Sequence, residues 1–99
     1  MHVNNQDWQT ILTNVFCKIN DCSAMDKFLA DVLTEKELQE IASRLQAAVM
    51  LDSNEKYTSI SDATGLSSRT VARISRWLKK DSGGYATAIK LVKEHHLHT

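Results

Sequence analysis

One glycine-centred segment, residues 57–78, constrains the fold of this 99-residue chain more than any other part of it. The segment reads YTSISDATGLSSRTVARISRWL, with Gly65 between two short helical patterns. Glycine tolerates the left-handed backbone that a sharp turn between two helices requires. Ser61 is small at the position where the second helix would pass most closely. Apolar residues recur where two crossed helices would pack, namely Ile60, Leu66, Val71 and Ile74. The pattern predicts a helix-turn-helix whose second helix opens at Ser67.

Charge of a single sign lies along one face of that second helix. The stripe consists of Arg69, Arg73, Arg76 and Lys80, spaced four, three and four residues apart. No acidic residue stands between Asp62 and Asp81. An ordinary solvated helix usually mixes signs, because opposite charges stabilise it by about 0.2–0.5 kcal/mol per pair. The stripe therefore favours a negatively charged partner, and the motif favours double-stranded DNA, whose major groove such a helix enters.

The residues expected to contact DNA follow from the geometry of such a helix. Amides at its start, with the hydroxyls of Ser67 and Ser68, can hold a phosphate. Arginine is suited to guanine, and residues further along the helix would meet backbone phosphates. The complete set of expected contacts is Ser67, Ser68, Arg69, Thr70, Ala72, Arg73, Arg76, Lys79 and Lys80.

The formal net charge of zero hides an asymmetry between the two parts of the chain. Residues 1–62 carry ten acidic and five basic residues, whereas residues 63–99 carry two acidic and seven basic residues. A basic part can dock on DNA while an acidic part stays away, but such a chain does not suit sequence-independent coating of DNA. An apolar content of 42% is typical of a globular protein. The N-terminus lacks a signal peptide and no apolar run could span a membrane, so we expect a cytoplasmic protein.

Apolar periodicity predicts helices along the rest of the chain, which has no proline and three glycines. We expect one all-α domain over residues 1–99 with about six helices. Its parts would be dimerisation helices in 1–51, a reading head in 57–80 and a C-terminal helix in 85–97. We expect the first helix to span residues 6–20 and the second to be capped by Ser23. The third should begin at the capping box of Thr34 and Glu37, and the last should follow a hinge at Gly83 and Gly84.

The first helix favours a homodimer. Its apolar stripe consists of Trp8, Ile11, Leu12, Val15, Phe16 and Ile19. A small reading head has little core with which to cover that stripe. A symmetric dimer would cover it and present two reading helices to two half-sites of an operator. The alternative is a monomer that folds these helices back on itself.

Two segments together resemble the Trp repressor family: FLADVLTEKELQEIASRLQAAVMLDSN and ISDATGLSSRTVARISRWLKK. The likeness covers about residues 28–80. It rests on Thr34 before an acidic helix, Arg44 ten residues further on, and a glycine-turned helix with Thr70, Val71 and Arg73. The chain is most similar to the family's presumed regulators in Gram-positive bacteria. The resemblance implies an intertwined, all-helical homodimer that binds operator DNA as a repressor.

The same resemblance implies a candidate effector pocket between the third helix and the reading helix. Thr34, Arg44 and Arg73 match positions that border the corepressor tryptophan in the family's namesake. Ile74 and Trp77 stand where the namesake has small residues. A buried indole at Trp77 would fill space that free tryptophan needs, so we expect L-tryptophan to bind weakly or not at all. We expect the pocket to bind a smaller anion or no cofactor at all.

Other chemistry has little support in the sequence. No nucleophile stands beside a base, so we expect no enzyme. The terminal histidines favour frayed polar ends over a metal site, and they are His2, His95, His96 and His98. Cys17 and Cys22 are expected to be reduced thiols. Cys17 is interpreted as a small residue packed against a partner chain, with a redox sensor as the alternative.

The sequence is also compatible with two rival functions. One is a DNA-binding module of a replication or recombination system, since a replication initiator's DNA-binding domain has a related fold. The other is a protein-interaction domain that keeps the helix-turn-helix without using DNA. The oligomeric state distinguishes the first rival from a homodimeric regulator. A DNA affinity that depends on salt distinguishes the regulator from the second rival.

Overall fold

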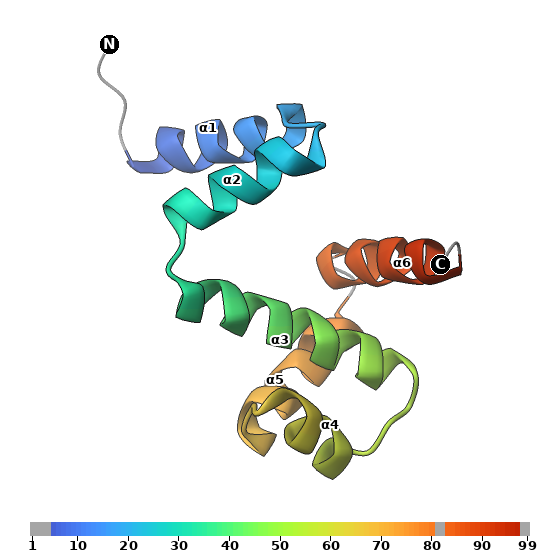
Figure 1. Ribbon diagram of the computed structural model, residues 1–99. Coiled ribbons are helices and arrows are strands. Elements are labelled where there is room, and N and C mark those ends of the chain that lie inside the picture. The colour runs from blue at the N-terminus through green and yellow to red at the C-terminus, as the bar shows by residue number, and fades with distance from the viewer. Residues whose placement is uncertain (1–4, 81–82, 98–99) are drawn as a thin grey trace. The chain divides into compact units, whose positions relative to one another are not determined.

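The computed structural model describes residues 5–80 and 83–97, and the side chains of 7–80 and 83–94. These residues form six helices and no strand, which confirms the all-α fold class. The helices are α1 (Asn5–Lys18), α2 (Cys22–Val32), α3 (Glu35–Asp52), α4 (Tyr57–Thr64), α5 (Ser68–Lys79) and α6 (Gly84–Leu97) (Figure 1). The chain divides into two compact units, Met1–Leu38 and Gln39–Thr99, and each is described by itself.

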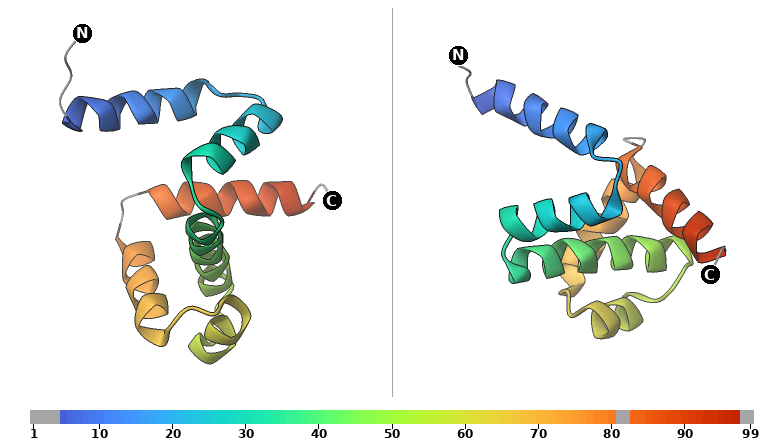
Figure 2. Two further views of the ribbon diagram at one scale, coloured as in Figure 1. Left: turned by 60° about the vertical axis from the view of Figure 1, so that its left-hand side comes forward. Right: turned by 45° about the horizontal axis from the view of Figure 1, so that its top comes forward.

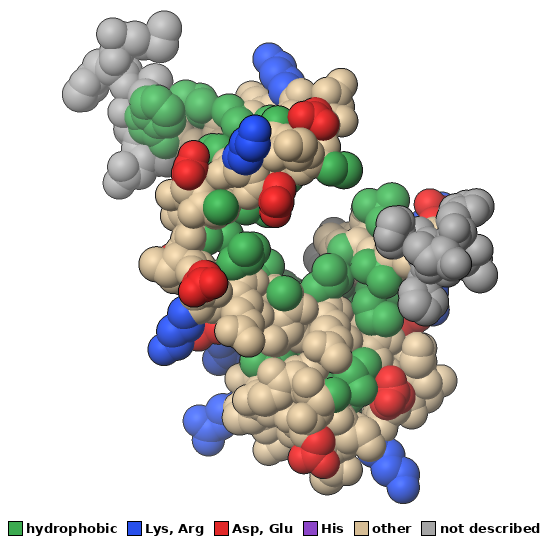
Figure 3. Space-filling model, in the orientation of Figure 1, with side chains coloured by type: hydrophobic (Ala, Val, Ile, Leu, Met, Phe, Trp, Pro, Cys, Tyr) green, Lys and Arg blue, Asp and Glu red, His purple; other side chains and the backbone are tan. Residues whose placement is uncertain are grey.

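The first unit contains α1, α2 and the start of α3. Phe16 of α1 and Phe28 of α2 pack edge to face, with ring centroids 5.6 Å apart and an interplanar angle of 75°. None of the side chains described between residues 7 and 38 is buried. Trp8 is 57% exposed and Val32 is 56% exposed. Hydrophobic side chains accordingly lie on the surface of α1 (Figure 3). The unit therefore leaves much of its apolar surface uncovered within one chain.

Local side-chain hydrogen bonds set the starts of α2 and α3. Asp21 caps α2, because its carboxylate accepts from the Ala24 N–H at 3.2 Å. The expectation that Ser23 caps this helix was wrong, since Ser23 lies inside it. The apolar periodicity starts only at Met25, so it missed the first three residues of the helix, Cys22, Ser23 and Ala24. At α3, Thr34 and Glu37 form the expected capping box.

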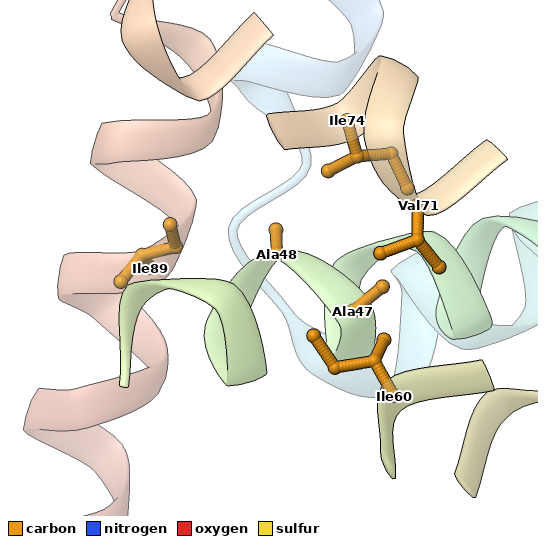
Figure 4. Close-up of a cluster of buried hydrophobic side chains, with 6 residues drawn as sticks. All are labelled: Ala47, Ala48, Ile60, Val71, Ile74 and Ile89. Carbon is orange, nitrogen blue, oxygen red and sulfur yellow. The ribbon is translucent and has the colours of Figure 1, made fainter. Parts of the chain in front are cut away.

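The core of the second unit gathers three helices, α4, α5 and α6, around α3. Ala47 and Ala48 of α3 are fully buried, and their small side chains let neighbouring helices approach closely. In Figure 4, Ile60 and Val71 lie beside Ala47, while Ile89 lies on the side of Ala48. The complete buried cluster is Ala47, Ala48, Ile60, Val71, Ile74 and Ile89. Each fully buried branched side chain stabilises the fold by about 1.5–3 kcal/mol, so this cluster is what fixes α4 and α5 on α3.

An ion pair on the surface also links α3 to α6. Asp52 is the last residue of α3, and its carboxylate pairs with the Lys93 ammonium of α6. Both side chains are well exposed to solvent. Exposed pairs contribute about 0–1 kcal/mol, so apolar packing by Ile89 is the stronger attachment of α6.

Candidate nucleic-acid interface

The turn between α4 and α5 is built around Gly65. Its backbone has φ 76° and ψ 2°, in the left-handed region, and its N–H donates to the Ser61 carbonyl at 2.9 Å. The Thr64 hydroxyl donates to the Ile60 carbonyl at 2.7 Å and accepts from the Leu66 N–H at 3.2 Å. These bonds hold the tight turn between two short helices that Figure 2 shows. The expected left-handed glycine at the turn is confirmed.

The start of α5 is capped as expected. The Ser67 hydroxyl accepts from the Thr70 N–H at 3.2 Å and donates to the Thr70 hydroxyl at 3.1 Å. Ser68 is the first helical residue, and both serines are exposed. The first-turn amides of a helix lack partners within that helix and carry partial positive charge. This end of α5 therefore has the chemistry that an anionic oxygen requires.

The two faces of α5 separate apolar from basic residues. Val71 is fully buried and Ile74 is 3% exposed, so one face is anchored in the core. Thr70 and Ala72 are half-buried at the edges of that face. Beyond the two cap serines, every exposed residue among those expected to contact DNA is basic. These residues are Arg69, Arg73, Arg76, Lys79 and Lys80. Four of these cations lie on α5; the expectation that Lys80 continues the helical stripe was wrong, because Lys80 caps the helix with extended backbone.

A small hollow lies beside this helix and brings together most of the candidate effector pocket. It measures about 220 Å³ and is lined by Arg44, Thr70, Arg73, Ile74, Trp77 and Tyr85. Three of the four expected residues, Arg44, Arg73 and Trp77, therefore meet. The fourth, Thr34, belongs to the unit Met1–Leu38, where its hydroxyl caps α3. Tyr85 of α6 was not expected, because no local pattern shows that the first turn of α6 returns to α5.

Trp77 differs from the expectation of a buried indole. Its side chain is 47% exposed, whereas Ile74, one turn earlier, is part of the core. Trp77 stands three residues after Ile74, and three residues correspond to 300° of helical rotation, which leaves it at the edge of the buried face. The Lys80 ammonium lies over its ring, 4.8 Å from the centroid. The indole is therefore a wall of the hollow.

Cys17 and Cys22 are free and exposed. Within the part of the chain that the structure describes, no three His, Cys, Asp or Glu side chains gather as a metal site would require. His2 and His98 lie outside the described residues, and the side chains of His95 and His96 are not described. Among the helices described, none has the length and apolarity to cross a bilayer.

These features define a class of protein: an all-helical protein with a helix-turn-helix and a basic second helix. The family model described as Trp repressor protein matches residues 6–93. The chain belongs to the Trp repressor family, a family of helical DNA-binding regulators. The match extends the likeness beyond residues 28–80 to α1 and most of α6. The chain is also 34% identical over 83 residues to the protein named Uncharacterized protein YerC from Bacillus subtilis (strain 168). That similarity covers 84% of this chain and 80% of that protein.

Proposed function

We propose that this protein is a sequence-specific transcriptional regulator that binds operator DNA as a homodimer and represses transcription. The observation that supports this proposal most directly is the exposed basic face of α5, from Arg69 to Lys79 with Lys80 as the C-cap, on a helix anchored by Val71 and Ile74. Membership of the Trp repressor family supports the same conclusion. We place the protein in the cytoplasm, where operator DNA is accessible.

The proposed contacts divide along α5 by depth in the groove. The first turn and a half faces base edges, with Ser68, Arg69, Ala72 and Arg73 as the reading residues. Arginine can bond two acceptors of guanine at once, so Arg69 and Arg73 would supply most of the sequence preference. Arg76, Lys79 and Lys80 would meet backbone phosphates, which position the helix without reading sequence. Thr70 and the Ser67 cap would fix the helix start against a phosphate.

The homodimer is proposed from uncovered apolar surface in each unit. Trp8, Leu12 and Val15 of α1 are all exposed. In the second unit, the lining of an open groove of about 760 Å³ includes Leu51, Leu78 and Ala86, together with charged side chains of α3, α5 and α6. Surfaces of this kind are covered in obligate dimers, whose interfaces resemble a domain core. We propose that a second copy of this chain, joined through the N-terminal helices and α6, covers both of these surfaces.

The test of DNA binding is selection of bound fragments from genomic DNA. We expect recovered sites with two-fold symmetry and half-sites about 34 Å apart, one helical turn. Affinity for the selected site should fall by about 10³–10⁵ between 50 and 200 mM salt if six to ten phosphates are contacted. Recovery of no preferred sequence, or an affinity that salt leaves unchanged, contradicts the proposal and favours a protein-interaction domain.

The oligomeric state is tested separately by sedimentation at micromolar concentration. We expect about twice the chain mass of 11.2 kDa. Deleting residues 1–22 should remove the dimer and leave an aggregating or poorly folded chain. A stable monomer of the intact chain would contradict the dimer and favour the replication or recombination module.

A further inference from the structure

Trp77 occupies a distinctive place in the second unit, between two small hollows. The first hollow is the one shared with Arg44, Arg73 and Tyr85. The second measures about 250 Å³ and is lined by Trp77, Leu78, Lys79, Lys80, Gly83, Tyr85 and Ala86. Trp77 and Tyr85 line both of them. The indole therefore stands where residues of α3, α5 and α6 come together.

The charges around this indole explain why an aromatic ring suits the position. Arg44 and Arg73 both line the first hollow, and neither has an ion-pair or hydrogen-bond partner among the described residues. Lys80 lies over the Trp77 ring, and no acidic side chain lines either hollow. The face of an indole is negative and attracts a cation within about 6 Å, and the Lys80 ammonium lies 4.8 Å from the centroid of the Trp77 ring. The ring of Trp77 thus attracts Lys80 at a place where no carboxylate lines either hollow.

The two hollows beside the ring are smaller than most ligand sites. The hollows measure about 220 and 250 Å³, and ligand sites typically measure about 300–1,000 Å³. The indole itself supplies a planar aromatic surface beside both hollows, and Lys80 lies over it. A group attached to the chain also acts at an effective concentration of millimolar or more, so it stays in place without a free ligand.

We propose that the indole of Trp77 is a built-in ligand of the reading head. It is a positioning residue, which holds α5 against Arg44 of α3 and Tyr85 of α6 in the orientation that binds DNA. DNA binding then requires no diffusible aromatic effector. This inference rests on the proposed function, because it assumes that α5 is the helix that reads DNA.

The experiment is replacement of the indole followed by its return as a free molecule. Trp77→Ala should lower operator affinity by about tenfold, within the range usual for coupling between two sites. Indole added at about 1 mM, near the effective concentration of a tethered group, should restore most of that loss. The parent protein should not respond to indole, and Trp77→Phe should keep most of the affinity.

A matched control removes an aromatic side chain from elsewhere in the same unit. Tyr57 of α4 is 42% exposed, close to the 47% of Trp77, and lines neither hollow. Operator binding by Tyr57→Ala should not change when indole is added. A ligand that fills the truncated site also stabilises the fold, so affinities are compared at a temperature where Trp77→Ala is fully folded, and rescue there separates positioning from general destabilisation.

A second readout needs no DNA. Indole should raise the thermal midpoint of Trp77→Ala and leave those of the parent and Tyr57→Ala unchanged. The inference is overturned if Trp77→Ala binds the operator as the parent does, or if indole restores neither affinity nor thermal midpoint. If the parent binds no DNA, the proposed function fails, while the indole-dependent midpoint still decides whether Trp77 fills a ligand site.

Discussion

Thr34 and Glu37 hydrogen-bond each other's backbone at the start of α3. The Thr34 N–H donates to the Glu37 carboxylate at 2.9 Å, and the Glu37 N–H donates to the Thr34 hydroxyl at 3.1 Å. Each bond satisfies an amide that has no partner within the helix. The bond from the Thr34 N–H, and then the contact with the Thr34 hydroxyl, lowers the pKa of Glu37 below its ordinary value of 4.5.

The first prediction is a pH dependence that this pair causes. Because the pKa is lowered in the folded state, the stabilisation is complete above about pH 4.5 and is lost as the pH falls through the folded-state pKa. The thermal midpoint of Glu37→Gln should therefore fall less steeply between about pH 5 and pH 3 than that of the parent. Glu35→Gln removes a carboxylate from the same turn but leaves the pair, so it should keep the parent's steeper fall. Parallel curves for the parent and Glu37→Gln would contradict the assignment.

The second prediction concerns the glycine of the helix-turn-helix. Gly65→Ala should destabilise the protein by about 1–2 kcal/mol, because φ is 76° there and a Cβ disfavours that region. Nothing lies within 4 Å of the added Cβ, so the cost comes from the backbone alone. Gly84→Ala, at the first residue of α6, is the control, and it should be neutral or stabilising. Chemical denaturation of the three proteins measures the difference. Equal effects of the two substitutions would be inconsistent with a strained turn.

Ser61 gives a third prediction. Its hydroxyl oxygen is buried and has no hydrogen-bond partner among the described residues. An unsatisfied buried polar group costs about 1–3 kcal/mol, so Ser61→Ala should leave stability unchanged or raise it. Ser61→Leu should lower stability by about 1–3 kcal/mol, because the side chain is half-buried with a fully buried hydroxyl oxygen and a larger side chain would overfill the position. A clear loss in Ser61→Ala, measured by urea denaturation, would mean that the hydroxyl makes a bond in solution.

The fourth prediction separates the two kinds of DNA contact on α5. Arg69→Ala should cost about 1–3 kcal/mol on a selected operator and relax the sequence preference, as expected for a base contact. Lys79→Ala should weaken all sequences alike and make the salt dependence shallower by about one phosphate contact. Both side chains are exposed, so neither change should affect folding. Titrations over a salt series with operator and scrambled DNA measure both effects. Unchanged operator affinity in Arg69→Ala would show that α5 does not enter the groove as proposed.

The last prediction is that free L-tryptophan does not bind the parent protein. The hollow beside Trp77 is about 220 Å³ and already has an indole as one wall. Calorimetry with L-tryptophan should give no heat of binding for the parent, whereas Trp77→Ser should gain binding. Ile74 should be left intact in that variant, since it is 3% exposed and its truncation would open the core. Tight binding by the parent, with stronger operator binding, would refute the steric argument.

Much of this architecture could be predicted from local patterns alone. The Thr34 and Glu37 box, the left-handed Gly65 and the Ser67 cap each depend on contacts within about four residues. The burial of Val71 and Ile74 follows from helical periodicity, because one face of an amphipathic helix must leave water. The start of α2 was the exception, since Asp21 and Ser23 both have capping side chains and periodicity does not choose between them.

The candidate pocket was decided by tertiary structure. Arg44 and Tyr85 stand far from Trp77 in sequence, and only the packing of α3 and α6 against α5 brings them to one hollow. The 47% exposure of Trp77 likewise depends on how those helices cross, because a residue at the edge of a buried face can lie on either side of it. The sequence by itself determined which segments are helices and which face of α5 is basic, since both follow from short-range periodicity. Which side chains meet around Trp77 depends on the angles between helices, and those are set by packing over distances that local patterns do not encode.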